Sequence, residues 1–363
     1  MPYTPPNLPL SFELETKPVL KKLAGAHRAL AELKGVTGIM PNQSILLSTL
    51  PVQEAKDSSA IENIITTDDE LYKSDVAAKV FPTVAAKEVH NYAGALRSGY
   101  EKVKKTKLLT NGQILEIHEM LEAGSPGFRK MPGTVLKNEK TGEVVYSPPQ
   151  EEAQIQRLMD NLEQFINESS RSDLDPLVKM AIIHHQFESI HPFYDGNGRT
   201  GRIINILYLV LYGLLDAPVL YLSRYINQHK NEYYRLLQEV RTHGAWEKWV
   251  LYMLDGLEQT SLQTTQLIEA MRDLMQRHKH KMREELPKIY SQDFLNHLFR
   301  HPYTKIEFVM HELRIHRHTA KKYLDELIRL GMVAKHRIGK EDFYLNIDLF
   351  ELLRKGPEKS LSS

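Results

Sequence analysis

The sequence predicts a mainly α-helical protein with one β-hairpin and a small C-terminal domain that mixes helices and strands. Apolar residues recur three and four positions apart along most of the chain. This period breaks over residues 128–149, and after residue 290 it gives way to shorter elements. We therefore expect one large helical body and a separate C-terminal unit.

The helical spacing is clear, for example, at residues 19–33, 45–54, 83–103, 151–167, 177–189, 203–212, 228–241 and 246–277. A further helix is expected after Thr110, because Gln113 follows three positions later as in a capping box. The longest apolar run, residues 203–215, is too short to cross a bilayer, which takes about 20 residues. It predicts a buried helix, and we expect no membrane partner.

The break in the pattern predicts a hairpin that projects from the helical body, called the flap below. Two short runs flank a polar, glycine-containing turn at residues 138–143: Thr134, Val135 and Leu136 before it, and Val144, Val145 and Tyr146 after it. Pro148 and Pro149 end the second run. The flap is expected to occupy residues 128–149.

The C-terminal pattern predicts a winged helix-turn-helix domain. Short helices are expected at residues 293–299, 305–313 and 319–330, and strands at residues 333–337 and 343–345. Gly331 is expected just after the last helix, and Gly339 and Lys340 in the turn between the strands.

The composition limits the classes of function. Lys and Arg number 47 and Asp and Glu 46, so no overall field attracts nucleic acid, membranes or acidic ligands, and any such partner must contact a local patch. The chain has no cysteine, which excludes disulfides, thiol nucleophiles and Cys-based zinc sites and fits a reducing compartment. Because the first ten residues also lack a signal-peptide pattern, we expect a cytoplasmic protein.

One loop combines residue types that bind phosphate and move protons. It consists of His191, Pro192, Phe193, Tyr194, Asp195, Gly196, Asn197, Gly198, Arg199, Thr200, Gly201 and Arg202. Its glycines satisfy the dinucleotide pattern G-x-G-x-x-G, but that pattern requires a preceding strand, and residues 177–187 have helical spacing. The context therefore disfavours a nicotinamide or flavin enzyme.

The loop instead predicts a turn between two helices, the second of which begins near Asn197. Backbone N–H groups and the helix dipole at such a turn suit a phosphate, and Arg199 and Arg202, three apart, can clamp a polyphosphate. Asp195 is placed to bind a hard cation such as Mg²⁺ together with phosphate oxygens. His191, which Pro192 biases out of the helix, can accept a proton from a hydroxyl.

The loop resembles the signature of the Fic family, H-P-F-x-[D/E]-G-N-G-R-x-x-R, at every specified position. The resemblance implies a protein adenylyltransferase that moves AMP from ATP to a Ser, Thr or Tyr hydroxyl of a target protein or of itself. His191 would be the general base, Asp195 the Mg²⁺ ligand, and Arg199 and Arg202 the contacts of the β- and γ-phosphates. The residues implied in nucleotide binding are Gly196, Asn197, Gly198, Arg199, Thr200, Gly201 and Arg202. Asn231, Tyr233 and Tyr234 resemble a family segment near the adenine pocket, and Asn231 and Tyr234 are the expected contacts.

The resemblance extends to the flap and to an upstream segment. The flap, with Thr134, Val135 and Leu136, would dock the target segment by strand addition. Ser58, Glu62 and Asn63 match the family's inhibitory motif [S/T]-x-x-x-E-[G/N], in which the glutamate pairs with the second signature arginine, here Arg202, and competes with the ATP γ-phosphate. The enzyme is therefore expected to be restrained by default.

The expected domains are an N-terminal helical region (residues 1–105) with the inhibitory motif at 58–63, a Fic catalytic core (106–256), a connecting helix (257–289), the winged-helix domain (290–350) and a tail (351–363). An alternative function is a transcriptional regulator, since residues 314–340 hold eight Lys and Arg against Asp325 and Glu326. A protein partner at the winged helix and a homodimer also stay open. The donor stays open too, because relatives with similar loops move phosphocholine, UMP or a phosphate.

Overall fold

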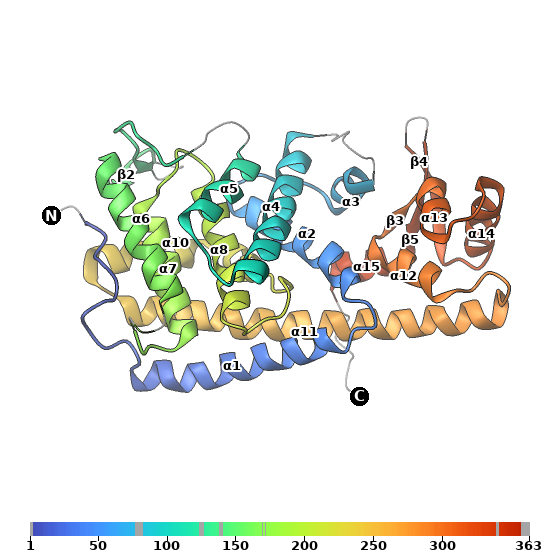
Figure 1. The fold of residues 1–363 in the computed structure, drawn as a ribbon, viewed down its shortest axis with the longest axis horizontal. Coiled ribbons are helices and arrows are strands. Elements are labelled where there is room, and N and C mark those ends of the chain that lie inside the picture. Colours follow the sequence, from blue (N-terminus) through green and yellow to red (C-terminus); the bar gives the residue numbers. More distant parts are fainter. Residues whose placement is uncertain are drawn as a thin grey trace.

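The computed structural model describes residues 3–76, 83–122, 127–137, 141–168, 170, 172–338 and 341–356. It confirms the mainly α fold class. The longest element, α11 (Trp246–Glu285), runs along the whole molecule, and α1 (Lys17–Gly38) packs beside it (Figure 1). The expected boundary between residues 256 and 257 lies inside α11, so the central region and the C-terminal region share one continuous helix.

The N-terminal region adds α2 (Gln43–Ile61), α3 (Asp68–Val76) and α4 (Val84–Thr106). The Asn42 and Thr83 side chains accept hydrogen bonds from backbone N–H groups in the first turns of α2 and α4, which satisfies donors that lack helical partners. Helix α2 continues through Pro51 and packs against α4. The predicted inhibitory motif lies where α2 ends.

The central region consists of α5 (Asn111–Leu121), α6 (Glu152–Asn167), α7 (Pro176–Ile190), α8 (Asn197–Leu211), α9 (Leu222–Gln228) and α10 (Lys230–His243). The predicted capping box of Thr110 and Gln113 is confirmed at the start of α5. Helices α7 and α8 pack against each other and are buried along nearly their whole length. The turn between them is therefore anchored at both ends in the core.

The flap is shorter than predicted. Strand β1 (Leu136–Lys137) pairs antiparallel with β2 (Val144–Tyr146), and Leu136 lies opposite Tyr146. Thr134 and Val135 lie outside the strand, because the paired segment begins only at Leu136. Residues 138–140 of the predicted turn lie outside the described residues.

The C-terminal region contains α12 (Gln292–Arg300), β3 (Tyr303–Thr304), α13 (Ile306–Leu313), α14 (Arg317–Arg329), β4 (Val333–Ile338), β5 (Glu341–Asn346) and α15 (Ile347–Lys355). The strands form an antiparallel sheet in the order β3-β5-β4. The predicted helices and strands are present, whereas β3 and α15 were not predicted. Gly339, Lys340 and residues 357–363 of the tail lie outside the described residues.

The C-terminal region packs on the N-terminal helices. Ser48 of α2 donates to the Arg300 carbonyl at 2.6 Å, and the Tyr303 hydroxyl donates to Asp69 of α3 at 2.6 Å. The helix that leads into the predicted inhibitory motif therefore contacts the C-terminal region as well as the core. Within the part of the chain that the structure describes, no helix is both long and apolar enough to cross a membrane.

Candidate active site

The predicted loop forms a tight turn between α7 and α8. His191 ends α7 with a left-handed φ of 50°, and Gly196 precedes α8 with a φ of 71°. The Asn197 side chain closes the turn, because it accepts from the Phe193 N–H at 2.9 Å and donates to the Phe193 carbonyl at 2.8 Å. Asn197 thus fixes the backbone geometry of the loop.

The His191 ring is held in its neutral form. Burial is the main cause, and together with the positive charges of Arg241 and Arg129 it lowers the pKa of His191 to about 3. A neutral imidazole carries a nitrogen that is free of a proton. His191 is therefore in the protonation state that a general base requires near neutral pH.

Arg202 is a buried cation held by the predicted inhibitory motif. Its side chain is 1% exposed, and its Nη2 lies 2.8 Å from the Glu62 carboxylate. Nε donates to the Ser58 hydroxyl at 2.7 Å, and Nη2 also donates to the Ser58 carbonyl at 3.0 Å. Lys230 donates to Asn63 at 3.0 Å and so contacts the end of the motif. The structure thus brings Ser58, Glu62 and Arg202 together as the motif predicts.

Arg199 is also buried, but its partners were not predicted. Its side chain is 4% exposed, and it pairs with Glu88 of α4 at 2.9 Å and with Glu122, which directly follows α5. The two carboxylates are far from Arg199 in the sequence, and no local motif marks either of them. Among the described residues, Arg199 Nε and Arg202 Nη1 are buried without a hydrogen-bond acceptor. Each guanidinium therefore keeps an unused donor at the turn.

Two glycines of the loop lie close to neighbouring side chains. A Cβ atom on Gly198 would lie 2.2 Å from Glu62 Oε1 and 2.8 Å from Arg202 Nη1. A Cβ atom on Gly201 would lie 2.8 Å from Glu188 Oε1, in the packing between α7 and α8. The Thr200 hydroxyl donates to the Gly196 carbonyl at 2.9 Å, within α8. Gly198 thus borders the Glu62–Arg202 pair, whereas Gly201 lies between α7 and α8 and Thr200 bonds at the start of α8.

Asp195 differs from its neighbours because its side chain is 84% exposed. One carboxylate oxygen accepts from the Gly196 N–H at 2.7 Å, and the Asp195 carbonyl contacts His118 Nε2 at 3.0 Å. A single accessible carboxylate at a turn that is predicted to bind phosphate fits Mg²⁺, which takes most of its remaining ligands from phosphate and water. The described residues contain no cluster of three or more metal-binding side chains.

Comparisons with known proteins agree with this geometry. The model of the Fic/DOC family N-terminal region matches residues 20–101, and the model of the Fic/DOC family matches residues 108–209, which include the turn. The model of the protein adenylyltransferase SoFic-like C-terminal domain matches residues 274–349. The chain belongs to the Fic/DOC family.

Individual relatives match only parts of this Fic chain. A probable protein adenylyltransferase of Aquifex aeolicus is 32% identical over 190 residues, which cover 50% of this chain and 54% of that protein. The protein adenylyltransferase Fic of Aedes aegypti is 30% identical over 165 residues, which cover 44% of this chain and 30% of that protein. The chain thus spans about half or less of the length of these relatives.

Solved Fic structures share the fold. A Fic family protein from Desulfovibrio desulfuricans superposes with a TM-score of 0.57 at 20% identity, and the match covers 94% of this chain and 98% of that chain. At this identity the likeness concerns the fold. It extends over both the helical body and the C-terminal region.

The residues expected near the adenine lie at the start of α10. Asn231 is exposed and Tyr234 is 45% exposed, so both side chains are accessible. Tyr233 between them is buried, and its hydroxyl lies 2.8 Å from His184 Nε2. Tyr233 thus belongs to the core of this Fic domain, whereas Tyr234 faces outward.

The flap lies next to the turn. The Tyr194 hydroxyl accepts from the Lys130 N–H at 3.1 Å and from the Met131 N–H at 2.9 Å. Val135 is 37% exposed, and Thr134 and Leu136 are half-buried, so the expected docking residues border solvent. The segment 134–136 of the flap is therefore accessible beside the Fic signature.

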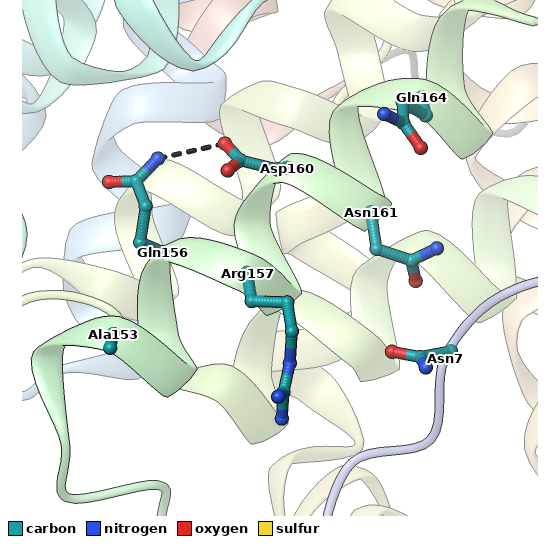
Figure 2. A pocket seen from close by; sticks show the side chains of 7 residues that line it. All are labelled: Asn7, Ala153, Gln156, Arg157, Asp160, Asn161 and Gln164. Carbon is teal, nitrogen blue, oxygen red and sulfur yellow. Dashed lines mark hydrogen bonds between the residues drawn. The ribbon is translucent and has the colours of Figure 1, made fainter.

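A surface pocket lies away from the signature loop. It is lined by Asn7 and by Ala153, Gln156, Arg157, Asp160, Asn161 and Gln164 of α6 (Figure 2). Asn161 accepts from the Leu8 N–H at 2.7 Å and donates to the Leu8 carbonyl at 2.9 Å. These bonds fasten the N-terminal segment to α6 beside the pocket.

The basic residues of the C-terminal region are mostly exposed, and several are paired with nearby carboxylates. The pairs are Arg317 with Glu307, Lys321 with Asp325, Arg329 with Glu326, and Lys335 with Asp342. These carboxylates reduce the positive field that the sequence indicates. The surface is less basic than the excess of Lys and Arg between residues 314 and 340 implies.

Proposed function

We propose that this protein is an adenylyltransferase that moves AMP from ATP to a Ser, Thr or Tyr hydroxyl of a target protein or of itself. The observation that carries the proposal is the α7–α8 turn, where the neutral His191 lies in the same loop as Arg199 and Arg202, two buried cations with unused donors. Relatives that match part of the chain and are named as protein adenylyltransferases support the proposal.

His191 acts as the general base in this proposal. Because His191 Nδ1 is fully buried, Nε2 is the ring nitrogen left to take the proton of the attacking hydroxyl. The hydroxyl oxygen forms a bond to the α-phosphorus in line with the bond that breaks, and pyrophosphate leaves with the electron pair of that bond. The acceleration comes mainly from positioning and from stabilisation of charge, as in other phosphoryl-type transfers.

The phosphates bind at the start of α8. The N–H groups of the turn and the helix dipole attract the triphosphate, and Arg199 and Arg202 contact the β- and γ-phosphates. Mg²⁺ held by Asp195 would neutralise part of the phosphate charge. Asn231 and Tyr234 border the adenine, and the flap residues Thr134, Val135 and Leu136 dock the target segment.

Glu62 restrains the enzyme in this proposal. Its carboxylate occupies Arg202 and lies over Gly198, where the γ-phosphate would otherwise bind. The triphosphate must therefore displace a negative charge as well as fill the turn. Helix α2 must move or its last turn must open before ATP can bind productively.

The C-terminal region completes the proposal as a winged-helix domain that packs on α2 and α3. Its contacts through Ser48 and Asp69 support a packing or partner-docking role over DNA binding. The lack of cysteine supports a reducing compartment, and we propose the cytoplasm as the location.

The test is the mass of the modified protein. We expect the Glu62→Gly variant, incubated with Mg²⁺ and ATP, UTP or CDP-choline in turn, to gain an AMP adduct on itself or on a protein of a cell extract with ATP alone. His191→Ala in the same background should abolish the adduct. A fully active His191→Ala variant would refute the base, and an adduct from another donor would refute the assignment of ATP.

A further inference from the structure

Arg129, at the base of the flap, makes an unusual set of contacts for a buried cation. Its side chain is fully buried, and Nε donates to the His191 carbonyl at 2.8 Å. Nη2 donates to the Pro149 carbonyl and, at 3.5 Å, to the Ile190 carbonyl. The Arg129 backbone N–H donates to the Pro192 carbonyl at 2.8 Å. Among the described residues, the acceptors of these hydrogen bonds are all backbone carbonyls.

These carbonyls offset part of the cost of burying the cation, although Arg129 Nη1 has no hydrogen-bond acceptor among the described residues. The last carbonyls of an α-helix have no partners within the helix, and they form the negative end of its dipole. Arg129 therefore caps the C-terminal end of α7, where Ile190 and His191 lie. The planar guanidinium can reach several carbonyls at once, which an ammonium cannot do.

The same residue joins the two ends of the flap. Arg129 lies near the beginning of the flap, and Pro149 lies at its end. Because the guanidinium bridges the Pro149 carbonyl and the His191 carbonyl, the flap ends and the catalytic turn share one anchor. Tyr194 adds a second connection, but it contacts only the Lys130 and Met131 N–H groups at the first flap end.

We propose that Arg129 is a positioning residue that fixes the flap against the His191 backbone, so that a target segment docked on the flap meets the base in register. The inference rests on the proposed function, in which His191 is the base and the flap docks the target. Its structural part, the coupling of the flap to the turn, is measurable without any transfer reaction.

The first measurement is hydrogen exchange in the full-length Glu62→Gly protein. In Arg129→Met we expect the amides of the flap base and of residues 190–196 to exchange at least tenfold faster together, and Arg129→Lys to restore part of the protection. Tyr194→Phe is the matched control, because it should loosen only residues 130 and 131. Unchanged exchange in α2 and α11 shows that the fold is intact. Faster exchange in the flap without the turn would overturn the coupling.

The second measurement separates positioning from general damage. We expect Arg129→Met to bind ATP within about twofold of its parent and to lose at least tenfold in the rate of AMP transfer, with partial rescue in Arg129→Lys. Transfer at the parental rate would overturn the positioning role while the proposed function stands. If the parent itself transfers no AMP although the exchange results hold, the proposed function fails and the coupling stands. If Arg129→Met does not fold, the Lys variant and Tyr194→Phe carry the comparison.

Discussion

The arginines of the α7–α8 turn and those of the C-terminal region differ in burial and in the origin of their partners. Arg199 and Arg202 are 4% and 1% exposed and pair with carboxylates brought by other helices. Arg317 and Arg329 are 65% and 59% exposed, and Arg329 pairs within its own helix. Exposed pairs contribute only about 0–1 kcal/mol, whereas a buried guanidinium left unpaired is costly. The energetic cost of an unpaired charge is therefore much higher at the turn than on the C-terminal surface, although the C-terminal region has more basic residues.

The largest expected effect tests whether Arg202 contacts the γ-phosphate and Arg199 the β-phosphate. In the Glu62→Gly background, Arg202→Ala should weaken ATP binding by about 10- to 150-fold, because hydrogen bonds to charged groups are worth about 1.5–3 kcal/mol. ADP binding should change by less than about twofold, since ADP lacks the γ-phosphate, and Arg199→Ala should weaken both nucleotides. Titration calorimetry measures all of these affinities.

Arg202→Lys serves as the control for the loss of buried charge in this experiment. It keeps the positive charge but lacks the planar fork, so it should retain part of the ATP affinity. Equal losses of ATP and ADP in Arg202→Ala would contradict the assignment of Arg202 to the γ-phosphate.

The next effect concerns Glu62, which pairs with Arg202 in the structure. Glu62→Gly should raise the rate of AMP transfer and the ATP affinity, by about 5- to 150-fold if the coupling has a typical strength of 1–3 kcal/mol. Ser58→Ala removes one acceptor from Arg202 but leaves the carboxylate in place, so its effect should be much smaller. Labelling with ATP that carries radioactive α-phosphate checks both variants. Unchanged labelling in Glu62→Gly would refute the restraint.

The sequence predicts the turn well because its information is local. The order of His191, Asp195, the glycines and the two arginines specifies a turn and a helix start, and the structure has both. Glu88 and Glu122 could not be predicted as partners of Arg199, since only the packing of α4 and α5 against α8 brings them near. Arg129 was missed for the same reason, because its acceptors are backbone carbonyls, which leave no mark on the sequence.

The prediction of the fold is limited in the same way, because local sequence patterns do not show how elements continue or pair. The helices follow from apolar periodicity and the start of α5 from its capping box, but α11 continues through the expected boundary at residue 257. The apolar spacing over residues 246–277 predicts one helix across this position, and the structure has it, but such spacing does not show where a domain ends within a helix. Strand β1 is shorter than the β-branched run around Thr134, because pairing with β2 begins only at Leu136.

The smallest expected effect concerns exposed basic residues of the C-terminal region. Arg314, Lys322 and Arg337 are exposed, and the described part of the chain supplies no carboxylate within ion-pair distance of them, so they are the residues best placed for DNA phosphates. Exchanging all three for Ala should leave AMP transfer within about twofold and stability within about 0.5 kcal/mol per site, as is usual for surface changes.

DNA retention by the 363-residue protein tests the alternative role of the C-terminal region, in which its exposed cations bind DNA. Because half of the nearby basic residues are already paired, we expect retention to be weak at physiological salt and little changed by these substitutions. The matched control exchanges the paired residues Arg317, Lys321 and Arg329. Unpaired exposed cations release counterions from DNA phosphates, whereas paired ones largely do not. Retention that falls steeply with salt, and that is lost in the first variant but kept in the control, would therefore establish the alternative role of the domain as a DNA-binding module.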